Sequence, residues 1–412
     1  MLLVRRLLLV PLALCLACAA PSASVRPAAP APARPTLVLV ESSPLETTLD
    51  HPDIPEARDV WPEMIQGATH TLDIAEFYLS NAPGSRLEPV IQAVEAAADR
   101  GVKVRVLAEE KFATTYPDTL ERLARRSGIT VRRLNTAASM GGVLHAKYFV
   151  VDGHDAYLGS QNFDWRSLDH IQELGLRVRV PEVVHALADV FERDWLLAGG
   201  STEPSPETTV GGPFPARVEG GEVRVTPVFS PQGFLPDPET WELPRMVKLI
   251  DEAKHSVRVQ VLTYKSRGRK GEDFPDLEEA LKRAAARGVE VELLVADWSK
   301  RKGIIEGLQA LQSPPGLTVK LLTIPPWSGG FIPFARVAHA KYMVVDGERA
   351  WVGTSNWERD YFTKTRNVGL IIEGEVFARR LDRFFADNWN SSYAALVDPH
   401  ATYTAPNISG AP

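Results

Sequence analysis

Cysteine is almost absent from this chain of 412 residues: both cysteines, Cys15 and Cys18, lie within the first twenty. The remainder can form no internal disulfide, so its stability must come from core packing. The sequence has no Cys/His cluster, no H-E-x-x-H segment and no acidic pair at ligand spacing, and therefore predicts no metal and no cofactor. It also lacks a P-loop and the G-x-S-x-G turn of serine hydrolases.

An excess of positive charge is missing as well. The formal net charge is −6 at pH 7, so any anionic substrate must be held by local positive charge. This balance neither supports nor excludes a nucleic acid. The content of 44% hydrophobic and 24% charged residues is typical of soluble globular proteins, and the length fits two or three domains.

The first twenty residues have the pattern of an export signal. Arg5 and Arg6 precede an apolar stretch, 7–20, that is too short to span a bilayer comfortably. Lipid attachment at Cys18, cleavage near Ala20 and an uncleaved anchor all fit this pattern. The Pro/Ala-rich segment 21–35 is typical of an extended tether. We expect an exported protein that is periplasmic, attached to the outer membrane as a lipoprotein, or secreted.

An internal repeat organises the rest of the chain. Each half alternates strands and helices, and in both halves a helix ends at Arg-Gly-Val, at 100–102 and at 287–289. This alternation predicts an α/β fold of two duplicated α-β-α sandwich halves with mostly parallel sheets. We place the halves at 36–198 and 222–398, with a Gly/Pro/Ser/Thr-rich linker at 199–221 and a tail at 399–412. The expected strands are 70–78, 102–107, 130–134, 255–264, 289–295 and 318–322, and the expected helices are 88–100, 119–126, 277–287 and 303–311.

The same block of chemistry-bearing residues closes the α/β run of each half. Each block has the pattern H-x-K-x-x-x-x-D, then an Asn seventeen positions after the His and a further polar residue at twenty-eight. One such motif could arise by chance, but two in register on a duplicated background do not. A pair of solvated strand faces is the plainer alternative, although packing alone gives no reason to keep His, Lys and Asn. The two sets are His145, Lys147, Asp152, Asn162 and Glu173, and His339, Lys341, Asp346, Asn356 and Asn367.

These residue types suit cleavage of a phosphodiester. One histidine can act as nucleophile and the other as proton donor, because the imidazole pKa lies near neutrality. Lysine and asparagine side chains can hold the non-bridging oxygens, and such cationic groups can replace a metal. Support without substrate contact is expected of a further set. These residues are Asp152, Asp346, Ser160, Thr354 and Asn367.

The duplicated motifs resemble those of the phospholipase D superfamily. Segments 39–42, 73–78, 159–168 and 353–362 are similar to one branch, the animal lysosomal 5′-exonucleases and related poxvirus envelope proteins. The resemblance runs from about residue 37 to about 393. It implies that the halves pack as a pseudo-dimer around one active site and that a phosphohistidine forms, as in covalent catalysis. This chain departs from the animal proteins, which are disulfide-bonded and glycosylated.

The substrate is less well defined by sequence. Lys265, Arg267, Arg269 and Lys270 follow one strand end and 300–302 (Lys-Arg-Lys) follow another, where a polyanion could bind. Trp298, Tyr264 and Phe77 could stack bases. Solvated loop charge and core aromatics are the alternative for these residues. The segment 331–334 (Phe-Ile-Pro-Phe) could instead touch a lipid or anchor its loop.

Three functions therefore remain open. The first is a metal-independent 5′-exonuclease on single-stranded nucleic acid, as the branch implies. The second is a phospholipase D or transphosphatidylase on glycerophospholipids, and the third is a non-catalytic binding protein. The intact His, Lys and Asn sets favour an enzyme. No protein partner is implied.

The half-sites differ at one informative place, Glu173 against Asn367. If each side chain contacts the histidine of its own half, the carboxylate raises the pKa of His145 and favours its protonated form. On that premise His145 is the general acid and then base, and His339 is the nucleophile.

Overall fold

The computed structural model describes residues 34–201, 208–266, 273–312 and 315–410. Residues 35–412 form one compact unit. The predicted signal segment, nearly all of the tether, Arg267, Arg269 and Lys270 lie outside the described residues. Within the described ranges, no helix is both long and apolar enough to cross a bilayer.

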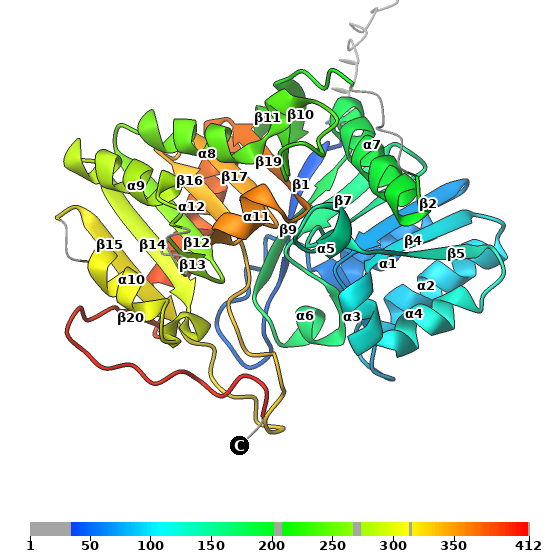
Figure 1. The fold of residues 1–412 in the computed structure, drawn as a ribbon, viewed down its shortest axis with the longest axis horizontal. Helices are drawn as coiled ribbons and strands as arrows, with labels where there is room; N and C mark the ends of the chain where they lie inside the picture. Colours follow the sequence, from blue (N-terminus) through cyan, green and yellow to red (C-terminus); the bar gives the residue numbers. More distant parts are fainter. Residues whose placement is uncertain (1–33, 202–207, 267–272, 313–314, 411–412) are drawn as a thin grey trace, which may run out of the picture. The chain divides into compact units, whose positions relative to one another are not determined.

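The first half is built on a seven-stranded sheet of order β1-β9-β7-β6-β2-β4-β5 (Figure 1). Strands β2, β4 and β5 pair in parallel, whereas β1, β9, β7, β6 and β2 pair antiparallel along the order. The bounds are Leu37–Ser42 (β1), Thr71–Glu76 (β2), Lys103–Glu109 (β4), Ile129–Leu134 (β5), Tyr148–Val151 (β6), Asp155–Gly159 (β7) and Glu173–Val178 (β9).

The second half repeats this sheet and extends it to nine strands, in the order β10-β11-β19-β17-β16-β12-β14-β15-β20. Here β12, β14 and β15 pair in parallel and the remaining neighbours antiparallel. The bounds are Phe214–Val218 (β10), Gly221–Ser230 (β11), Ser256–Val261 (β12), Glu290–Ala296 (β14), Leu317–Leu322 (β15), Tyr342–Val345 (β16), Arg349–Gly353 (β17), Asn367–Glu373 (β19) and Ala394–Leu396 (β20).

Helices cover both sheets, and two short parallel ladders, β3 with β8 and β13 with β18, stand beside them. The ladder strands are Leu79–Ser80 (β3), Phe163–Asp164 (β8), Tyr264–Lys265 (β13) and Trp357–Glu358 (β18). The helices of the first half are Ala57–Gln66 (α1), Glu88–Asp99 (α2), Glu110–Thr115 (α3), Pro117–Ala124 (α4), Thr136–Ser139 (α5), Trp165–Asp169 (α6) and Pro181–Ala198 (α7). Those of the second are Glu242–Asp251 (α8), Asp276–Ala286 (α9), Ile305–Leu311 (α10), Arg359–Thr363 (α11) and Glu375–Asn390 (α12), with the 3-10 turns Pro238–Thr240 (η1) and Asp297–Lys300 (η2).

The α/β duplication predicted from sequence is confirmed, and each predicted element appears within two or three residues of its expected ends. The parallel arrangement holds for the strands that alternate with helices. Both motif strands, β6 and β16, pair antiparallel on each side. On one side this follows from the tight turn that joins each of them to the next strand, β7 or β17.

The predicted linker is partly structured. Its segment Phe214–Val218 forms the edge strand β10, which pairs with β11 of the second sheet. The composition suggested a linker because Gly and Pro surround this strand. Its alternating exposed and buried side chains carry the weaker signal of an edge strand, which the composition obscured.

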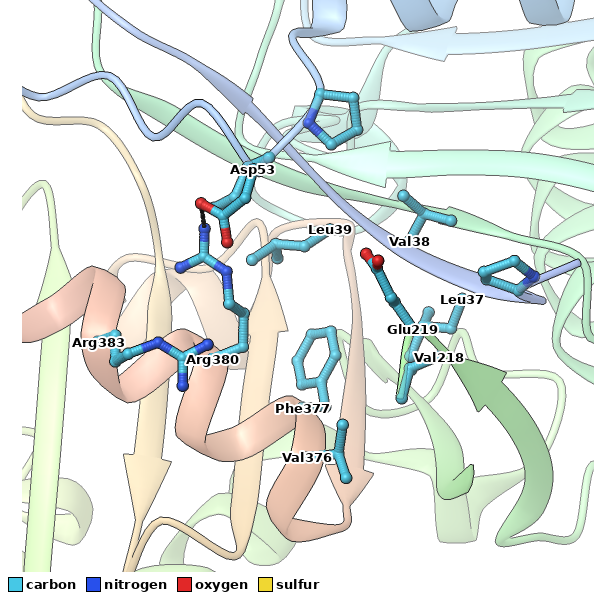
Figure 2. A pocket seen from close by; sticks show the side chains of 13 residues that line it. Leu37, Val38, Leu39, Asp53, Val218, Glu219, Val376, Phe377, Arg380 and Arg383 are labelled. Carbon is cyan, nitrogen blue, oxygen red and sulfur yellow. Dashed lines mark hydrogen bonds and ion pairs between the residues drawn. The ribbon is translucent and has the colours of Figure 1, made fainter. Parts of the chain in front are cut away.

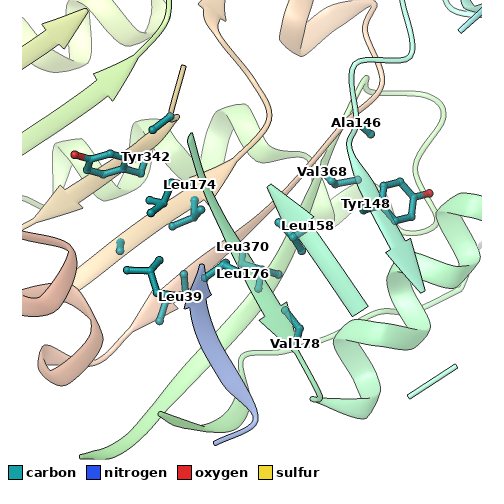
Figure 3. Close-up of a cluster of buried hydrophobic side chains, with 14 of the residues drawn as sticks. Leu39, Ala146, Tyr148, Leu158, Leu174, Leu176, Val178, Tyr342, Val368 and Leu370 are labelled. Carbon is teal, nitrogen blue, oxygen red and sulfur yellow. The ribbon is translucent and has the colours of Figure 1, made fainter. Parts of the chain in front are cut away.

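A shared hydrophobic core joins the halves. One cluster of buried side chains takes members from both sheets and from α7 and α12. Figure 3 shows Leu174 and Leu176 of β9 in this cluster together with Val368 and Leu370 of β19. Two further clusters lie within the separate halves. Because the halves share a core, they present their motif loops to each other in a fixed geometry.

Candidate active site

The two motif histidines belong to one buried site. Each histidine precedes its motif strand, His145 before β6 and His339 before β16. Burial lowers the pKa of both imidazoles well below the usual value, and Lys147 and Lys341 add to this effect at each of them. Both lysines therefore lie within electrostatic range of both histidines, so the repeat builds one site from two half-sites.

The side chain of Asn367 holds His145 across the interface between the halves. Its Oδ1 lies 3.2 Å from Nδ1 of His145. The amide orientation is fixed, because its Nδ2 donates to the carbonyl oxygens of Tyr361 and Thr365, and its Oδ1 accepts from Thr354. An acceptor therefore faces His145 Nδ1, which must carry the proton, and the Nε2 lone pair is left for chemistry.

Glu173 holds His339 in the equivalent way. Its Oε2 lies 2.7 Å from Nδ1 of His339, and its Oε1 accepts from the hydroxyl of Ser167 at 3.0 Å. Burial raises the pKa of Glu173 to about 8, opposed by the nearby lysine charges. The pair shares one proton, and either position of that proton leaves Nε2 of His339 directed away from the carboxyl group.

The premise behind the sequence-based division of labour is therefore wrong. Glu173 contacts the histidine of the other half, His339, and Asn367 contacts His145. The sequence could not reveal this, because contacts across the interface depend on how the halves pack. The same charge argument, applied to the observed contacts, now places the carboxylate beside His339.

Both motif lysines are buried beside their histidines. Nζ of Lys147 donates to the carbonyl oxygen of His145 at 2.5 Å, and Nζ of Lys341 donates to that of His339. Burial lowers the pKa of Lys147 well below its usual value and that of Lys341 to about 7. The ammonium groups are short of compensating charge, so an anionic phosphate would stabilise both.

The two motif asparagines are also buried. The Oδ1 atoms of Asn162 and Asn356 have no hydrogen-bond partner within the described part of the chain. Ser160 accepts from the backbone N–H of Leu174, next to Glu173, and Thr354 donates to Asn367. Both hydroxyls thus support the residues that hold the histidines.

The motif aspartates lie at the far end of their strands from the histidines. Asp152 accepts from the backbone N–H groups of residues 69–71 at 2.7 to 2.8 Å, and Asp346 accepts from those of 254–256. Although burial opposes it, these hydrogen bonds lower the pKa of Asp152 to about 2. Both residues have positive φ values in their turns. Their hydrogen bonds join each motif strand to the start of the neighbouring strand, β2 or β12.

Three further residues complete the site, and two of them were not predicted. The ring of Phe77 lies 5.1 Å from that of His145 and 4.8 Å from Nζ of Lys147. Tyr361 stands perpendicular to His145 at 4.9 Å. Glu76 is buried near Lys147, and burial raises its pKa well above the usual value. Glu76 could have been identified as a carboxylate within an apolar strand. Tyr361 could have been identified because the first half has Ser167 at the equivalent position of the repeat.

The structure places the predicted substrate-binding residues in different environments. Tyr264 is wrong as a stacking platform, because its ring is 2% exposed and packs in the core of the second half. Trp298 is half-buried at the edge of the shared core, and Lys265 lies on β13 with partial exposure. Arg301 lies close enough to lower the pKa of Tyr361, although burial raises that pKa to about 12 overall.

A cavity of about 360 Å³ lies elsewhere, between β1, the end of β10 and α12. Figure 2 shows its apolar floor and the ion pair of Arg380 with Asp53, which measures 2.5 Å. None of the motif residues lines it, so the cavity is separate from the histidine site. In the described ranges, His, Cys, Asp and Glu side chains form no group of three that could hold a metal ion.

Comparison with known proteins supports the geometry. The family model "Cardiolipin synthase, PLD-like domain" matches residues 62–195 and 246–389, one copy in each half. The protein named Phospholipase D Z of Dictyostelium discoideum is 30% identical over 88% of this chain and 91% of its own length. The protein named 5′-3′ exonuclease PLD3 of Macaca fascicularis is 33% identical over 88% of this chain and 81% of its own.

A solved structure shares the fold. The crystal structure of phosphatidylserine synthase from Haemophilus influenzae aligns with a TM-score of 0.60 at 12% identity, over 83% of this chain and 85% of that one. Two copies of the family domain, two histidines buried with their lysines in one site, and relatives matched over most of their length all agree. The chain belongs to the phospholipase D superfamily, with one PLD-like domain in each half, and is a phosphodiesterase-type hydrolase.

Proposed function

We propose that this protein cleaves single-stranded nucleic acid from its 5′ end through a phosphohistidine, without a metal ion. The observation that carries the chemistry is that a residue of the opposite half binds Nδ1 of each histidine, Asn367 at His145 and Glu173 at His339. These contacts direct both Nε2 atoms away from Asn367 and Glu173. A phosphodiester between them can be attacked by one imidazole while the other protonates the leaving oxygen. Lys147 and Lys341 then balance the charge that develops on the phosphoryl oxygens.

The roles of the histidines follow from charge. Burial and the lysines lower the pKa of both imidazoles, but only His339 shares a proton with a carboxyl group, whose negative charge can balance an imidazolium. His339 is therefore the general acid of the first step and the base that activates water in the second. His145 faces a neutral amide, stays unprotonated more readily, and is the nucleophile. This reverses the assignment that the sequence alone suggested.

The rings beside His145 support a nucleic-acid substrate. Phe77 contacts Phe112 at 4.0 Å and Tyr361 lies on another side of His145, so aromatic faces surround one end of the site. Bases stack on such faces without regard to sequence. The relatives named 5′-3′ exonucleases are consistent with this substrate. A phospholipid is the second candidate. Phe331 and Phe334, 59% and 44% exposed before His339, and the relative named Phospholipase D Z favour it.

The deciding experiment supplies both substrates to the purified protein in excess chelator. We expect degradation of single-stranded DNA with a free 5′-hydroxyl, slower degradation after 5′-phosphorylation, and little release of choline from phosphatidylcholine. Activity that vanishes in chelator and returns with a divalent ion would refute the metal-free mechanism. Cleavage of closed circles would refute the exonuclease proposal, and faster choline release would favour the lipid.

Trapping assigns the histidines. With a phosphodiester that has a good leaving group, His339→Asn should accumulate a phosphoryl adduct on residue 145, detected by mass spectrometry of peptides. His145→Asn should form none. The opposite pattern would restore His339 as the nucleophile.

We further propose that the protein is exported through residues 1–20 and carries a lipid at Cys18 or begins near residue 21. Mass spectrometry of the mature N-terminus from the native host tests this. An intact Met1 in an unprocessed chain would contradict it.

A further inference from the structure

Each histidine is held twice by the opposite half. The backbone N–H of Arg366 donates to the carbonyl oxygen of Val143 at 3.0 Å, and its carbonyl oxygen accepts from the N–H of His145 at 3.0 Å. Gln172 binds Val337 and His339 in the same pattern, at 3.0 and 2.8 Å. Arg366 and Gln172 directly precede Asn367 and Glu173. One dipeptide in each half therefore contacts the opposite histidine through both its backbone and its Nδ1 atom.

The side chain of Arg366 points the other way along its strand and is anchored in the first half. Successive side chains of a strand alternate in direction, so Asn367 faces His145 while Arg366 reaches α7. Its Nε and Nη2 each donate to Asp194 at 2.8 Å, and further hydrogen bonds reach the carbonyl oxygens of Ser230 and Phe234 at 2.9 Å. Both members of the pair are fully buried. We call Arg366 and Asp194 the charged clamp.

The pair of residues at the equivalent positions of the repeat, Gln172 and Asn388, is neutral. Nε2 of Gln172 donates to Oδ1 of Asn388 at 2.9 Å, and its Oε1 accepts from Gln260 at 2.7 Å. Tyr342 of the motif strand β16 donates to Gln260 at 2.8 Å, which ties this network to the histidine strand. Asp194 and Asn388 occupy the same position of the repeat, on α7 and α12. We call Gln172 and Asn388 the neutral clamp.

We propose that Arg366 and Gln172 are positioning residues, each of which fixes the opposite histidine through the backbone, with Asp194 and Asn388 as their anchors. If an anchor is lost, the strand start shifts and carries the histidine loop with it. Displacement by about 1 Å at a reacting group can cost about 100-fold in rate. The inference rests on the two histidines performing the chemistry.

The repeat itself supplies the test. Arg366→Gln and Asp194→Asn each break the charged clamp, and the double variant converts it into the Gln–Asn pair of the other half. The substrate is methyl p-nitrophenyl phosphate, a simple phosphodiester, assayed at a temperature at which near-ultraviolet circular dichroism shows every variant folded. Each single variant should lose about 10- to 100-fold in kcat with KM changed less than about threefold, and the double variant should regain most of kcat.

Two further variants keep the test decisive. Gln172→Met breaks the neutral clamp without leaving a buried charge, and should also lower kcat with little change in KM. Asp73→Asn is the matched control, because it breaks the bidentate ion pair with Arg105 at 2.6 and 2.9 Å. Among the described residues, this pair makes no hydrogen bond or ion pair with either histidine loop. The control variant should lower the melting temperature and leave kcat unchanged.

Full kcat in folded Arg366→Gln, Asp194→Asn and Gln172→Met would overturn the proposal and make both clamps purely structural. A double variant that regains the melting temperature but not kcat would overturn the equivalence of the clamps. Failure of the mechanism itself is distinguishable: the wild type would then be inactive, or His145→Asn would remain active.

Discussion

Glu173→Gln separates the roles of the two histidines. The change removes one charge and keeps the shape, so His339 faces an amide as His145 already does. Ser167 can still bind the Oε1 position. In the proposed mechanism the first step needs His339 to donate a proton, and the carboxylate supplies much of the stabilisation of the imidazolium.

The expected loss follows from the distance. The hydrogen-bonded atoms are 2.7 Å apart, so the two charges are centred about 4 Å apart, where an effective dielectric of about 20 gives about 4 kcal/mol. The neighbouring lysines oppose part of this stabilisation. A loss of 3 to 4 kcal/mol is about 100- to 1000-fold in rate. This loss of rate should appear only with substrates whose leaving group must receive a proton.

The assay therefore compares the rates of cleavage of two substrates whose leaving groups differ in their need for a proton. Glu173→Gln should lower the rate of the first chemical step by about 100-fold or more on an alkyl phosphodiester. On a p-nitrophenyl ester, whose leaving group needs no proton, the loss of the burst rate should be under about 10-fold. Asn367→Ala is the matched control beside the nucleophile and should slow both substrates to a similar extent. Equal losses for Glu173→Gln on both substrates would refute His339 as the acid.

Three other predictions follow from the same geometry. Burial lowers the pKa of Lys341 to about 7 in the free enzyme, so its ammonium form is present below that pH and lost above it. The value of kcat/KM should therefore fall from pH 7 to pH 9, and a flat profile would contradict this. Burial raises the pKa of Glu242 from 4.5 to about 7, so the folded state binds its proton more tightly than the unfolded state does and loses that stability as pH rises through 7. Glu242→Gln should therefore remove up to about 3 kcal/mol of the fall in unfolding free energy between pH 5 and 8. The same fall in the variant, measured by urea unfolding at each pH, would refute this. Tyr361→Leu should raise KM for single-stranded DNA about 10-fold, as expected for one lost stacking contact, and leave KM for methyl p-nitrophenyl phosphate unchanged; equal effects on both substrates would argue against stacking.

Local patterns predicted the elements well, and the site only in part. The helix ends at Gly101 and Gly288 were readable because a left-handed residue must follow the last turn, and both have φ values near +90°. The motif histidines and lysines were readable because chemistry restricts those residue types. The partners of the histidines were not, since Glu173 and His339 lie 166 positions apart and meet only through packing of the halves.

Charge and aromatic content were weaker guides. Tyr264 is an aromatic residue that could stack on a base, yet it begins the short strand β13 and is buried in the core of the second half. Glu76 could have been noticed as a carboxylate in an apolar strand, because the repeat has Val261 at the same position. The residues that the copies share thus identified the site, whereas the differences between the copies could be interpreted only once their contacts were known.

The differences also explain how one motif can take two chemical roles. A symmetric pair of histidines would have equal proton affinities and no preferred direction of attack. This chain breaks the symmetry by charge, with Glu173 at one histidine and Asn367 at the other, and in the anchors, with a charged clamp on one side and a neutral clamp on the other. It also breaks the symmetry in shape, because Phe77 and Tyr361 stand beside His145, whereas the repeat has Leu262 and Ser167 at the equivalent positions. Duplication supplies the two imidazoles, and in the proposed mechanism the few positions that differ between the copies decide which attacks and which donates the proton.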